Sequence, residues 1–484
     1  MNRTSVNFHP QNISTFNNLE KNNNNIHDED KFHWKFWKKR RYVVGLLAFF
    51  GFFVSYILRA GLSIAIVVMT TSSNKGDAEF DWDLKLQGLI LSAFFYGYVS
   101  SQIFGGILSS KIGGKKVLGF GIGITALLTI ITPPLTRTSV YLLIIVRVFV
   151  GICEGVTFPS MHTMWTYWAP PVERTRLATL SLAGSIFGSV FAMPMSGVIA
   201  QRFNWDSIFY IYGSLGVLWF FLWIFFVFDK PDDDPYISIT ERDYINNSLA
   251  NDKTEKNSSY PWKSILTSIP FWAIVVSHFC ESWGSQTMVT QLPIFMHDIL
   301  KFETEQMGFV SALPFFGMGV VVLFSGHIAD YLQSHNYLNT TQVRKVFTCG
   351  AFLGQTIFIV LAGFMTSTIF VVTCITIAST VGGFAWAGFM VNMLDIAPQH
   401  ASILLGISTT ISMVPGIISP VLTGYIVTNK TAEEWRIVFI IIAVFYIIGA
   451  FIFAIFASGK KQKWADNSNK QNAVSYYNSA MVCE

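Results

Sequence analysis

The chain has 484 residues, of which 52% are hydrophobic and only 13% are charged. Soluble domains carry about 25% charged residues, so a disordered, fibrous or ordinary soluble protein is excluded. The net charge of +4 is too small to indicate nucleic-acid binding, and five cysteines, most of them in apolar runs, argue against a disulfide-linked scaffold. The protein classes that remain possible are a channel, a transporter, a receptor and a membrane enzyme.

Long apolar runs follow one another along the chain. A helix that crosses the membrane needs about 20 apolar residues, and no short cleavable signal precedes the first run, so we expect that run to stay in the protein. The sequence therefore predicts an all-α membrane protein with twelve transmembrane helices, at about 42–70, 86–109, 117–136, 139–165, 177–200, 207–228, 266–296, 306–329, 346–367, 369–393, 402–427 and 436–457.

Lys and Arg set the orientation of such helices. If both ends of the chain are cytoplasmic, the cytoplasmic segments carry about three times as many of these residues as the opposite side. The predicted organisation is a disordered Asn-rich cytoplasmic arm with a basic end (1–40), a six-helix bundle (41–228), a cytoplasmic linker (229–264), a second six-helix bundle (265–458) and a cytoplasmic tail (459–484).

The two predicted bundles show an internal repeat. Glycines at 88, 97 and 106 in the second span have the same spacing of nine residues as glycines at 308, 317 and 326 in the eighth. Ala-Pro pairs and Trp-Phe pairs recur in the same order, with a nearly constant offset. Such a pattern indicates duplication of a six-helix unit, which is typical of transporters with a site between the halves.

Only two basic residues, Arg59 and Arg147, fall deep within predicted spans. A charge at mid-membrane costs about 2.5–3.5 kcal/mol on insertion scales, so it faces the protein interior, a partner or water. Guanidinium groups bind carboxylate or phosphate bidentately. We therefore predict that Arg59 and Arg147 bind an anionic substrate; the alternative is that each is a structural ion-pair partner.

Three further ionisable residues in the spans are candidates for a function. Glu154 follows Arg147 by seven residues, about 10 Å along the helix, and is the candidate for ion coupling; the alternative is helix packing through Gly151 and Gly155. His162 is a second coupling candidate or a hydrogen-bonded structural residue. Glu281 is a cavity or gating candidate that pairs with an arginine, binds a cation or is structural.

Helix-breaking residues mark candidate gating positions at Gly184, Gly188 and Pro415, where the alternative is plain packing. No HExxH, P-loop or nucleophile-elbow motif is present, so we predict no enzymatic activity, no metal and no cofactor apart from a co-transported H⁺ or Na⁺. The energy for transport then comes from an ion gradient.

The basic loop after the second span resembles the signature of the major facilitator superfamily. Its residues are Gly106, Lys111, Gly113 and Lys115, and Asp330 keeps the acid in the second half. The segments from Arg147 to Arg176 and around 395–398 are similar to the anion:cation symporter family, and most similar to its sialin branch. The resemblance covers about 41–465.

That resemblance implies a twelve-helix bundle with alternating access, in which Arg59 binds substrate, Arg147 lines the cavity and Glu154 couples protons. Val150 replaces a second acid of the sialin branch. Glu281 and Leu91 stand where glutamate-transporting members have basic residues, which argues against glutamate. We expect proton symport of a sialic acid-like or other organic anion; the alternatives are sodium-coupled phosphate transport and, more remotely, an anion channel.

The expected partners are a small-molecule anion and the lipid bilayer, with no nucleic acid and with a monomer as the default. The resemblance implies a lysosomal or vesicular membrane, or else the plasma membrane. Asn429, in Asn429-Lys430-Thr431, is the glycosylation sequon on a predicted outer loop.

Overall fold

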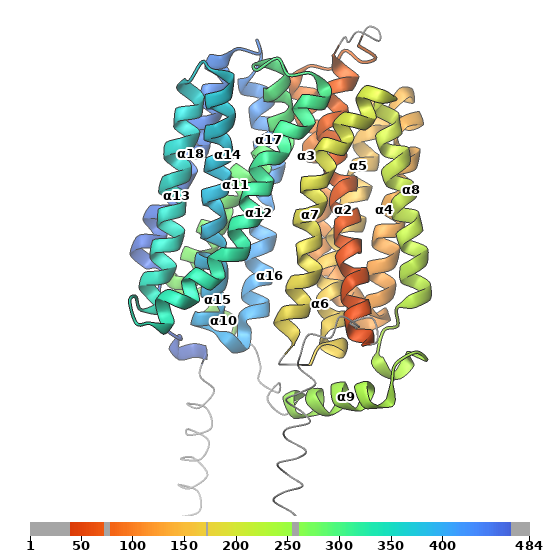
Figure 1. Cartoon of the computed structure of the whole chain (residues 1–484), viewed down its shortest axis with the longest axis vertical. Helices are drawn as coiled ribbons and strands as arrows, with labels where there is room; N and C mark the ends of the chain where they lie inside the picture. Colours follow the sequence, from red (N-terminus) through yellow and green to blue (C-terminus); the bar gives the residue numbers. More distant parts are fainter. Residues whose placement is uncertain (1–38, 72–77, 171–172, 254–260, 466–484) are drawn as a thin grey trace, which may run out of the picture.

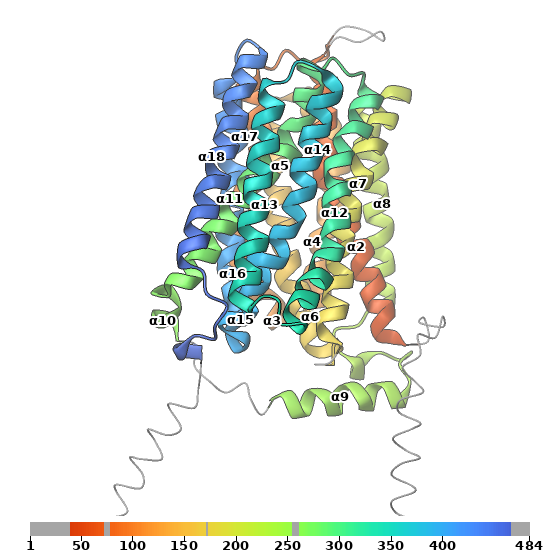
Figure 2. The same ribbon diagram turned by 60° about the vertical axis from the view of Figure 1, so that its left-hand side comes forward.

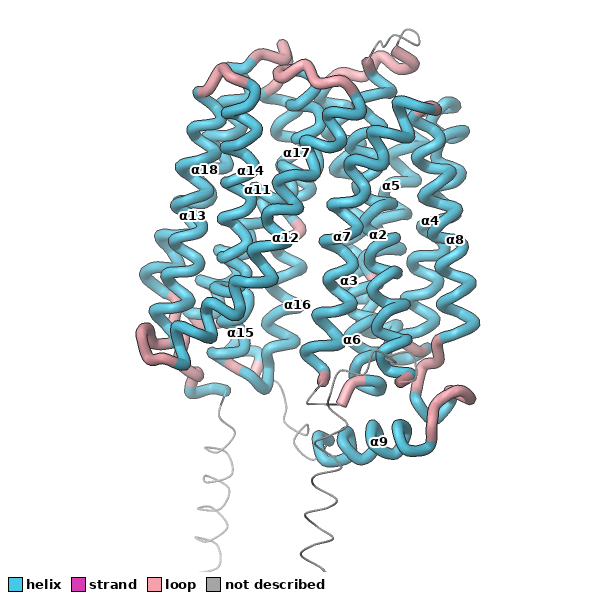
Figure 3. Tube along the Cα trace, viewed as in Figure 1, coloured by secondary structure: helices cyan, strands magenta, loops and turns pink. Residues whose placement is uncertain are grey.

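A computed structural model describes residues 39–71, 78–170, 173–253 and 261–465. Nearly all of the predicted N-terminal arm and most of the predicted C-terminal tail lie outside these ranges. Within them every regular element is a helix and no strand occurs (Figure 3).

The helices fall into two groups separated by a linker. The N-terminal half consists of α2 (Arg40–Thr70), α3 (Leu84–Ile112), α4 (Gly114–Thr138), α5 (Val140–Gly155), α6 (Thr157–Trp168), α7 (Arg174–Arg202) and α8 (Trp205–Phe226). The linker contains α9 (Ile239–Lys253) and α10 (Trp262–Leu266). The C-terminal half consists of α11 (Ile269–Asp298), α12 (Thr304–Ser334), α13 (Thr340–Phe364), α14 (Thr368–Ala385), α15 (Val391–Ile396), α16 (Ala401–Ser412), α17 (Val414–Ile426) and α18 (Ala432–Phe456).

Three of the predicted spans are interrupted helices. The fourth span is α5 and α6, the tenth is α14 and α15 joined by a π-helix, and the eleventh is α16 and α17. Ten spans in the described chain are long and apolar enough to cross a membrane, and the bent α3 makes eleven. The remaining predicted span is α11, most of whose residues are buried in the protein, among them polar ones such as Glu281, Gln286 and Gln291. The predicted all-α fold is confirmed, and the described helices are consistent with the predicted twelve spans.

The two halves stand side by side (Figure 1). Helix α9 lies across one end of the N-terminal half, and α2 begins and α18 ends at that same end (Figures 1 and 2). We call it the α9 end; the sequence predicts that it is cytoplasmic. Helices α7 and α12 lie close together at the opposite end and diverge toward the α9 end (Figure 1).

Glycines of the internal repeat join the halves at the end opposite α9. A Cβ atom on Gly308 of α12 would lie 2.6 Å from the Met193 carbonyl oxygen of α7, and one on Gly88 of α3 would overlap the Pro420 carbonyl of α17. Gly88 and Gly308 are equivalent positions of the repeat, so the two contacts are related by its pseudo-symmetry. The structure is therefore closed at this end.

The linker helix is tied to the N-terminal half by ion pairs. The Arg41 guanidinium donates to both carboxylate oxygens of Glu173 at 2.8 and 3.0 Å, and to Glu241 of α9 at 3.0 Å. Arg40 donates to Asp234 at 2.7 Å. Burial alone would raise the pKa of Glu173, but the Arg41 hydrogen bonds and charge outweigh it, so the pKa lies below its ordinary value of 4.5.

Replacing Glu173 with glutamine should lower stability. Loss of the charged hydrogen bonds costs about 2 kcal/mol. Because the pKa of Glu173 is lower in the folded state, this stabilisation is complete above pH 4.5, the ordinary value, and is lost as the pH falls through the folded-state pKa. Thermal unfolding of purified wild type and E173Q should differ at neutral pH and converge in acid. The exposed Glu303 offers a control, E303Q, which should change stability little. Equal stability of E173Q and wild type at neutral pH would contradict the assignment.

Another ion pair stabilises the end of the tenth span. Arg344 of α13 donates to Asp395 of α15 at 2.6 Å and to the Ala387 carbonyl at 2.9 Å. Ala387 lies in the π-helix Trp386–Met390, whose wider turn disturbs the regular backbone hydrogen bonding. Arg344 therefore stabilises the break as well as the helix end.

Candidate anion-binding site

Arg59 of α2 is surrounded by aromatic rings. Its Cζ atom lies 4.7 Å from the ring centroids of both Phe94 and Phe95, and 5.6 and 5.8 Å from those of Tyr56 and Tyr98. Ring faces attract a guanidinium, and they do so more strongly where water is scarce. The rings hold the side chain in place without neutralising its charge.

Within the described residues, the hydrogen bond of the Arg59 guanidinium goes to the other half of the molecule. Arg59 donates to the Gln286 side-chain oxygen of α11 at 3.1 Å. Gln286 is 8% exposed, and its amide nitrogen lies near the Met413 sulfur at the break between α16 and α17. Arg59 therefore lies at the boundary between the two halves, where a bound molecule would contact both.

Arg147 of α5 is more deeply buried, at 3% exposure. Its Cζ lies 5.6 Å from the Phe94 ring, so Phe94 contacts both guanidinium groups. The Arg147 Nε is buried without a hydrogen-bond partner. A buried, unpaired donor on a cation is costly, and a bound anion would remove that cost.

Close packing of α3 on α5 brings Phe94 to Arg147. Added Cβ atoms on Gly97 or Gly151 would overlap carbonyl oxygens of the facing helix, at Val148 and Phe94 respectively. One on Gly155 would overlap Tyr98 and Ser101. Gly151 and Gly155 thus pack closely on α3, as the alternative interpretation of this helix face expected, and this packing places the aromatic side chains of α3 beside the arginines.

Glu154 lies beside these arginines, just before the break between α5 and α6 at Val156. It is 2% exposed, Ser55 lies next to its carboxylate, and Arg59 and Arg147 are both close enough to interact with it electrostatically. Its Oε1 is buried without a hydrogen-bond partner. An acid so placed can respond both to a proton and to an anion on the arginines, which is the arrangement that coupling requires.

Neither arginine forms an ion pair with a carboxylate in the part of the chain that the structure describes. The alternative interpretation, in which each arginine is a structural ion-pair partner, required a carboxylate beside each guanidinium. Two cations that share Phe94 and one nearby acid leave net positive charge at the boundary of the halves. The site is therefore suited to an anion.

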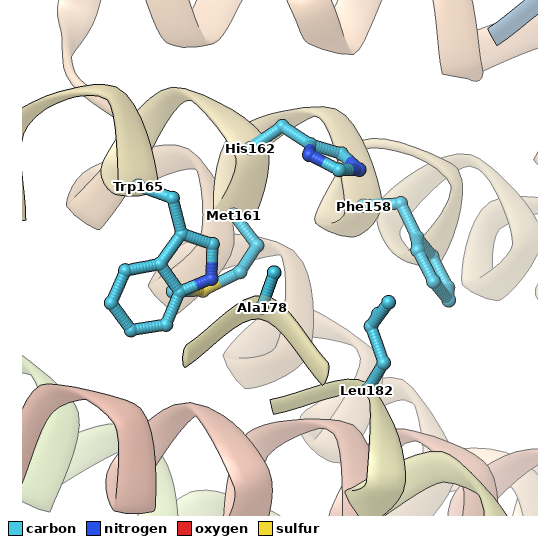
Figure 4. Close-up of a pocket in the computed structure, with 6 residues that line it drawn as sticks. All are labelled: Phe158, Met161, His162, Trp165, Ala178 and Leu182. Atoms are coloured by element: carbon cyan, nitrogen blue, oxygen red, sulfur yellow. The ribbon is translucent and has the colours of Figure 1, made fainter. Parts of the chain in front are cut away.

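His162 does not join this site. It lies on α6, eight residues after Glu154 and beyond the break that separates α6 from α5. Its exposed side chain lines a small pocket between α6 and α7, together with Phe158, Met161, Trp165, Ala178 and Leu182 (Figure 4). A direct role for His162 beside Glu154 is not supported by this placement.

Glu281 does not face the arginines either. Its carboxylate points toward α13, where it accepts a hydrogen bond from Gln355 at 3.3 Å. Gln286 of the same helix takes the position opposite Arg59. The expected pairing of Glu281 with an arginine is therefore not seen, and the charge argument that used Glu281 against glutamate loses its basis.

The gating candidates are packing positions in this structure. Added Cβ atoms on Gly184 or Gly188 of α7 would meet the carbonyls of Phe49 and Phe53 on α2, within the N-terminal half. Pro415 is near the start of α17, and the glycine after it packs on Phe95. Pro415 thus marks a break next to the aromatic rings around Arg59.

The loop signature lies at the α9 end. Gly113 has φ of 99°, a left-handed conformation that favours glycine, and the Asp229 carboxylate accepts from the Lys115 backbone at 2.9 Å. A Cβ atom added to Gly106 would lie 3.8 Å from the Cβ of Pro159. Lys111 and Asp330 are exposed. These residues shape the loop and are remote from the arginines.

Two further predictions concern surface and metal chemistry. Asn429 is exposed at the end opposite α9, and its amide donates to Glu434 at 2.9 Å, so a glycan there would replace that contact. Among the described residues, no group of three or more His, Cys, Asp or Glu side chains is arranged to hold a metal ion.

Sequence reasoning missed Gln286 and the ring cluster of Tyr56, Phe94, Phe95 and Tyr98. Gln286 is a polar side chain in the middle of a span, which is itself a signal. The rings gave no signal, because aromatic residues are common throughout this chain.

Comparison with known proteins identifies the family of this chain. The Major Facilitator Superfamily profile matches residues 48–420 and 342–478. Human sialin is 42% identical over 453 residues, covering 89% of this chain and 91% of sialin. Zebrafish (Danio rerio) vesicular glutamate transporter 2.2 is 40% identical over 441 residues, covering 88% and 75%.

Solved transporters share the fold at low sequence identity. A bacterial homologue of the human lysosomal transporter Spinster, in an inward-facing conformation, has a TM-score of 0.65 at 14% identity, covering 86% of this chain and 96% of that one. A D-xylose–proton symporter has a TM-score of 0.66 at 13% identity, covering 87% and 99%. The chain therefore belongs to the major facilitator superfamily, in the family of sialin and the vesicular glutamate transporters, and it is a multi-pass secondary transporter of anions, not an enzyme.

Proposed function

We propose that this protein carries an organic anion of the sialic acid type together with a proton, by alternating access. Arg59 and Arg147 hold the carboxylate, and Glu154 takes up and releases the proton. The observation that carries the proposal is the pair of arginines at the boundary of the halves, with no carboxylate partner among the described residues and with Glu154 beside them.

Coupling follows from the electrostatic interaction of Glu154 with Arg59 and Arg147. When an anion occupies the arginines, its negative charge makes a second negative charge on Glu154 unfavourable. Binding of the anion therefore favours protonation of Glu154, and loss of the proton favours release of the anion. Because this linkage is reciprocal, each gradient can drive the other species.

The compartment is part of the proposal. Relatives that are 38–42% identical include sialin and several vesicular glutamate transporters. We place this protein in a lysosomal or vesicular membrane on that basis. Proton coupling suits such a compartment if its interior is acidic, because protons leaving it would carry the anion with them.

Uptake into proteoliposomes tests the substrate and the coupling ion together. Radiolabelled sialic acid, glutamate and phosphate are supplied under an imposed pH gradient or an imposed sodium gradient. We expect saturable sialic acid uptake that follows the pH gradient and stops with a protonophore. Phosphate uptake driven by sodium, or a non-saturating flux, would contradict the proposal and favour a phosphate cotransporter or a channel.

Glu154→Gln should separate anion binding from proton coupling. Glutamine keeps the size of the side chain but cannot ionise, so the pH dependence of uptake should flatten while exchange of labelled for unlabelled anion continues. The measurement is initial uptake and exchange over a range of pH. Ser55→Ala, beside the carboxylate, is the control and should retain the pH dependence. A wild-type pH profile in E154Q would remove Glu154 from the coupling step.

A further inference from the structure

A second buried acid lies apart from the anion site, in the C-terminal half. Glu281 of α11 is 2% exposed. One of its carboxylate oxygens accepts from the Gln355 amide at 3.3 Å, and the other, Oε2, has no hydrogen-bond partner. Gln355 is also 2% exposed, and its own oxygen is unpartnered. The mechanism proposed above does not use these groups.

No cation compensates a charge on Glu281 within the described chain. The hydrogen bond to its carboxylate there comes from the Gln355 amide, and none of the ion pairs of the described residues includes Glu281. Tyr446 of α18 and Cys280 of α11 are close enough to interact with it electrostatically, and neither side chain is a cation. His278, one turn away, is paired instead with Ser408 at 2.9 Å. An ionised carboxylate here would be an uncompensated buried charge, which is strongly unfavourable.

Gly382 of α14, which has no side chain, leaves room for the side chains of Glu281 and Gln355. An added Cβ on Gly382 of α14 would overlap the Gln355 amide nitrogen and would lie 3.3 Å from the Glu281 Oε1. Three helices, α11, α13 and α14, therefore meet at the two side chains. Hard divalent cations take about six oxygen ligands, and the acid and the amide offer far fewer, so the ligand that fits is a proton.

A line of buried polar side chains leads from this pair toward the α9 end. Arg344, Thr348 and Gln355 lie on one face of α13, four and seven residues apart, or about 6 and 10 Å along the helix. The Thr348 hydroxyl is buried without a partner. Unsatisfied buried polar groups of this kind are commonly hydrogen-bonded to water. The line ends at the Arg344–Asp395 ion pair.

We propose that Glu281 and Gln355 form a second proton-binding site, carried by the C-terminal half and reached from the α9 end along α13. In the conformation described here Glu281 holds the proton, and its hydroxyl can donate to the Gln355 oxygen after rotation of the amide. Only the use of this proton in transport rests on the proposed function; the binding of the proton does not.

Infrared spectroscopy of the purified full-length protein tests the protonation directly. A protonated carboxylic acid gives a carbonyl band that is absent from a carboxylate or an amide side chain. At neutral pH we expect wild type and E154Q to share such a band, and E281Q to lose it. A band of unchanged intensity in E281Q, or no such band in E154Q, would overturn the proposal.

Gln355→Leu covers the case in which E281Q does not fold. Leucine keeps the volume of the side chain but removes the hydrogen bond, so the Glu281 band should remain and move to higher frequency. An unmoved band would overturn the proposal. The band needs neither substrate nor flux, so a protonated Glu281 in a protein without anion uptake would refute the proposed function and leave this site standing.

Discussion

Replacing either Arg59 or Arg147 with alanine should abolish concentrative anion uptake. Each substitution removes a charged hydrogen-bonding partner from a desolvated site, which costs about 2–5 kcal/mol of binding, or at least about thirtyfold in affinity. Arg59→Lys should rescue little of the loss, because an ammonium cannot make the planar two-point contact of a guanidinium. Initial rates of uptake in proteoliposomes, normalised to reconstituted protein, are the measurement.

The control for this experiment is an arginine outside the site. Arg137 is an exposed residue of α4 that pairs with Glu79 at 2.7 Å, and Arg137→Ala should leave uptake close to wild type. Normal uptake in both R59A and R147A would refute the anion site. The two residues share Phe94, so the double variant should show losses that are not additive.

Gly308→Val should inhibit transport by opening the closed end. Gly308 packs on the Met193 carbonyl and on the Gly197 backbone, so a valine side chain there would separate α12 from α7. Overpacking of this kind costs about 1–3 kcal/mol, which shifts an equilibrium between two conformations by about 5–150-fold. We expect a matching fall in the uptake rate and a shift toward the state that is open at the end opposite α9.

A matched control lies on the same helix. An added Cβ on Gly326 would have no heavy atom within 4 Å, so Gly326→Val should leave uptake close to wild type. The shift can be followed with a cysteine at Leu91, a buried residue of α3 beyond Gly88 from the closed end. In the G308V background, L91C should react faster with an impermeant thiol reagent applied from that end. Equal reactivity with and without G308V would contradict the closed-end assignment.

The internal repeat shows which feature of the closed end was visible in the sequence and which was not. The spacing of glycines at 88 and 308 was visible in the sequence and indicated duplication. Their partners, near Pro420 and Met193, lie in the opposite half and are more than 100 residues distant along the chain. Glycine spacing predicts that a helix face packs closely, but it does not indicate which helix packs against it.

The sequence by itself determined the class of protein and the charges at its centre. Apolar runs of membrane length predict helices because the bilayer leaves backbone polar groups no other partners, and Arg59, Arg147 and Glu154 stood out because charges within such runs are expensive. Only the tertiary structure decided which of the buried charges share a site. It placed Gln286 opposite Arg59 and turned Glu281 toward Gln355, because five residues along a helix rotate a side chain by about 140° to a different neighbour.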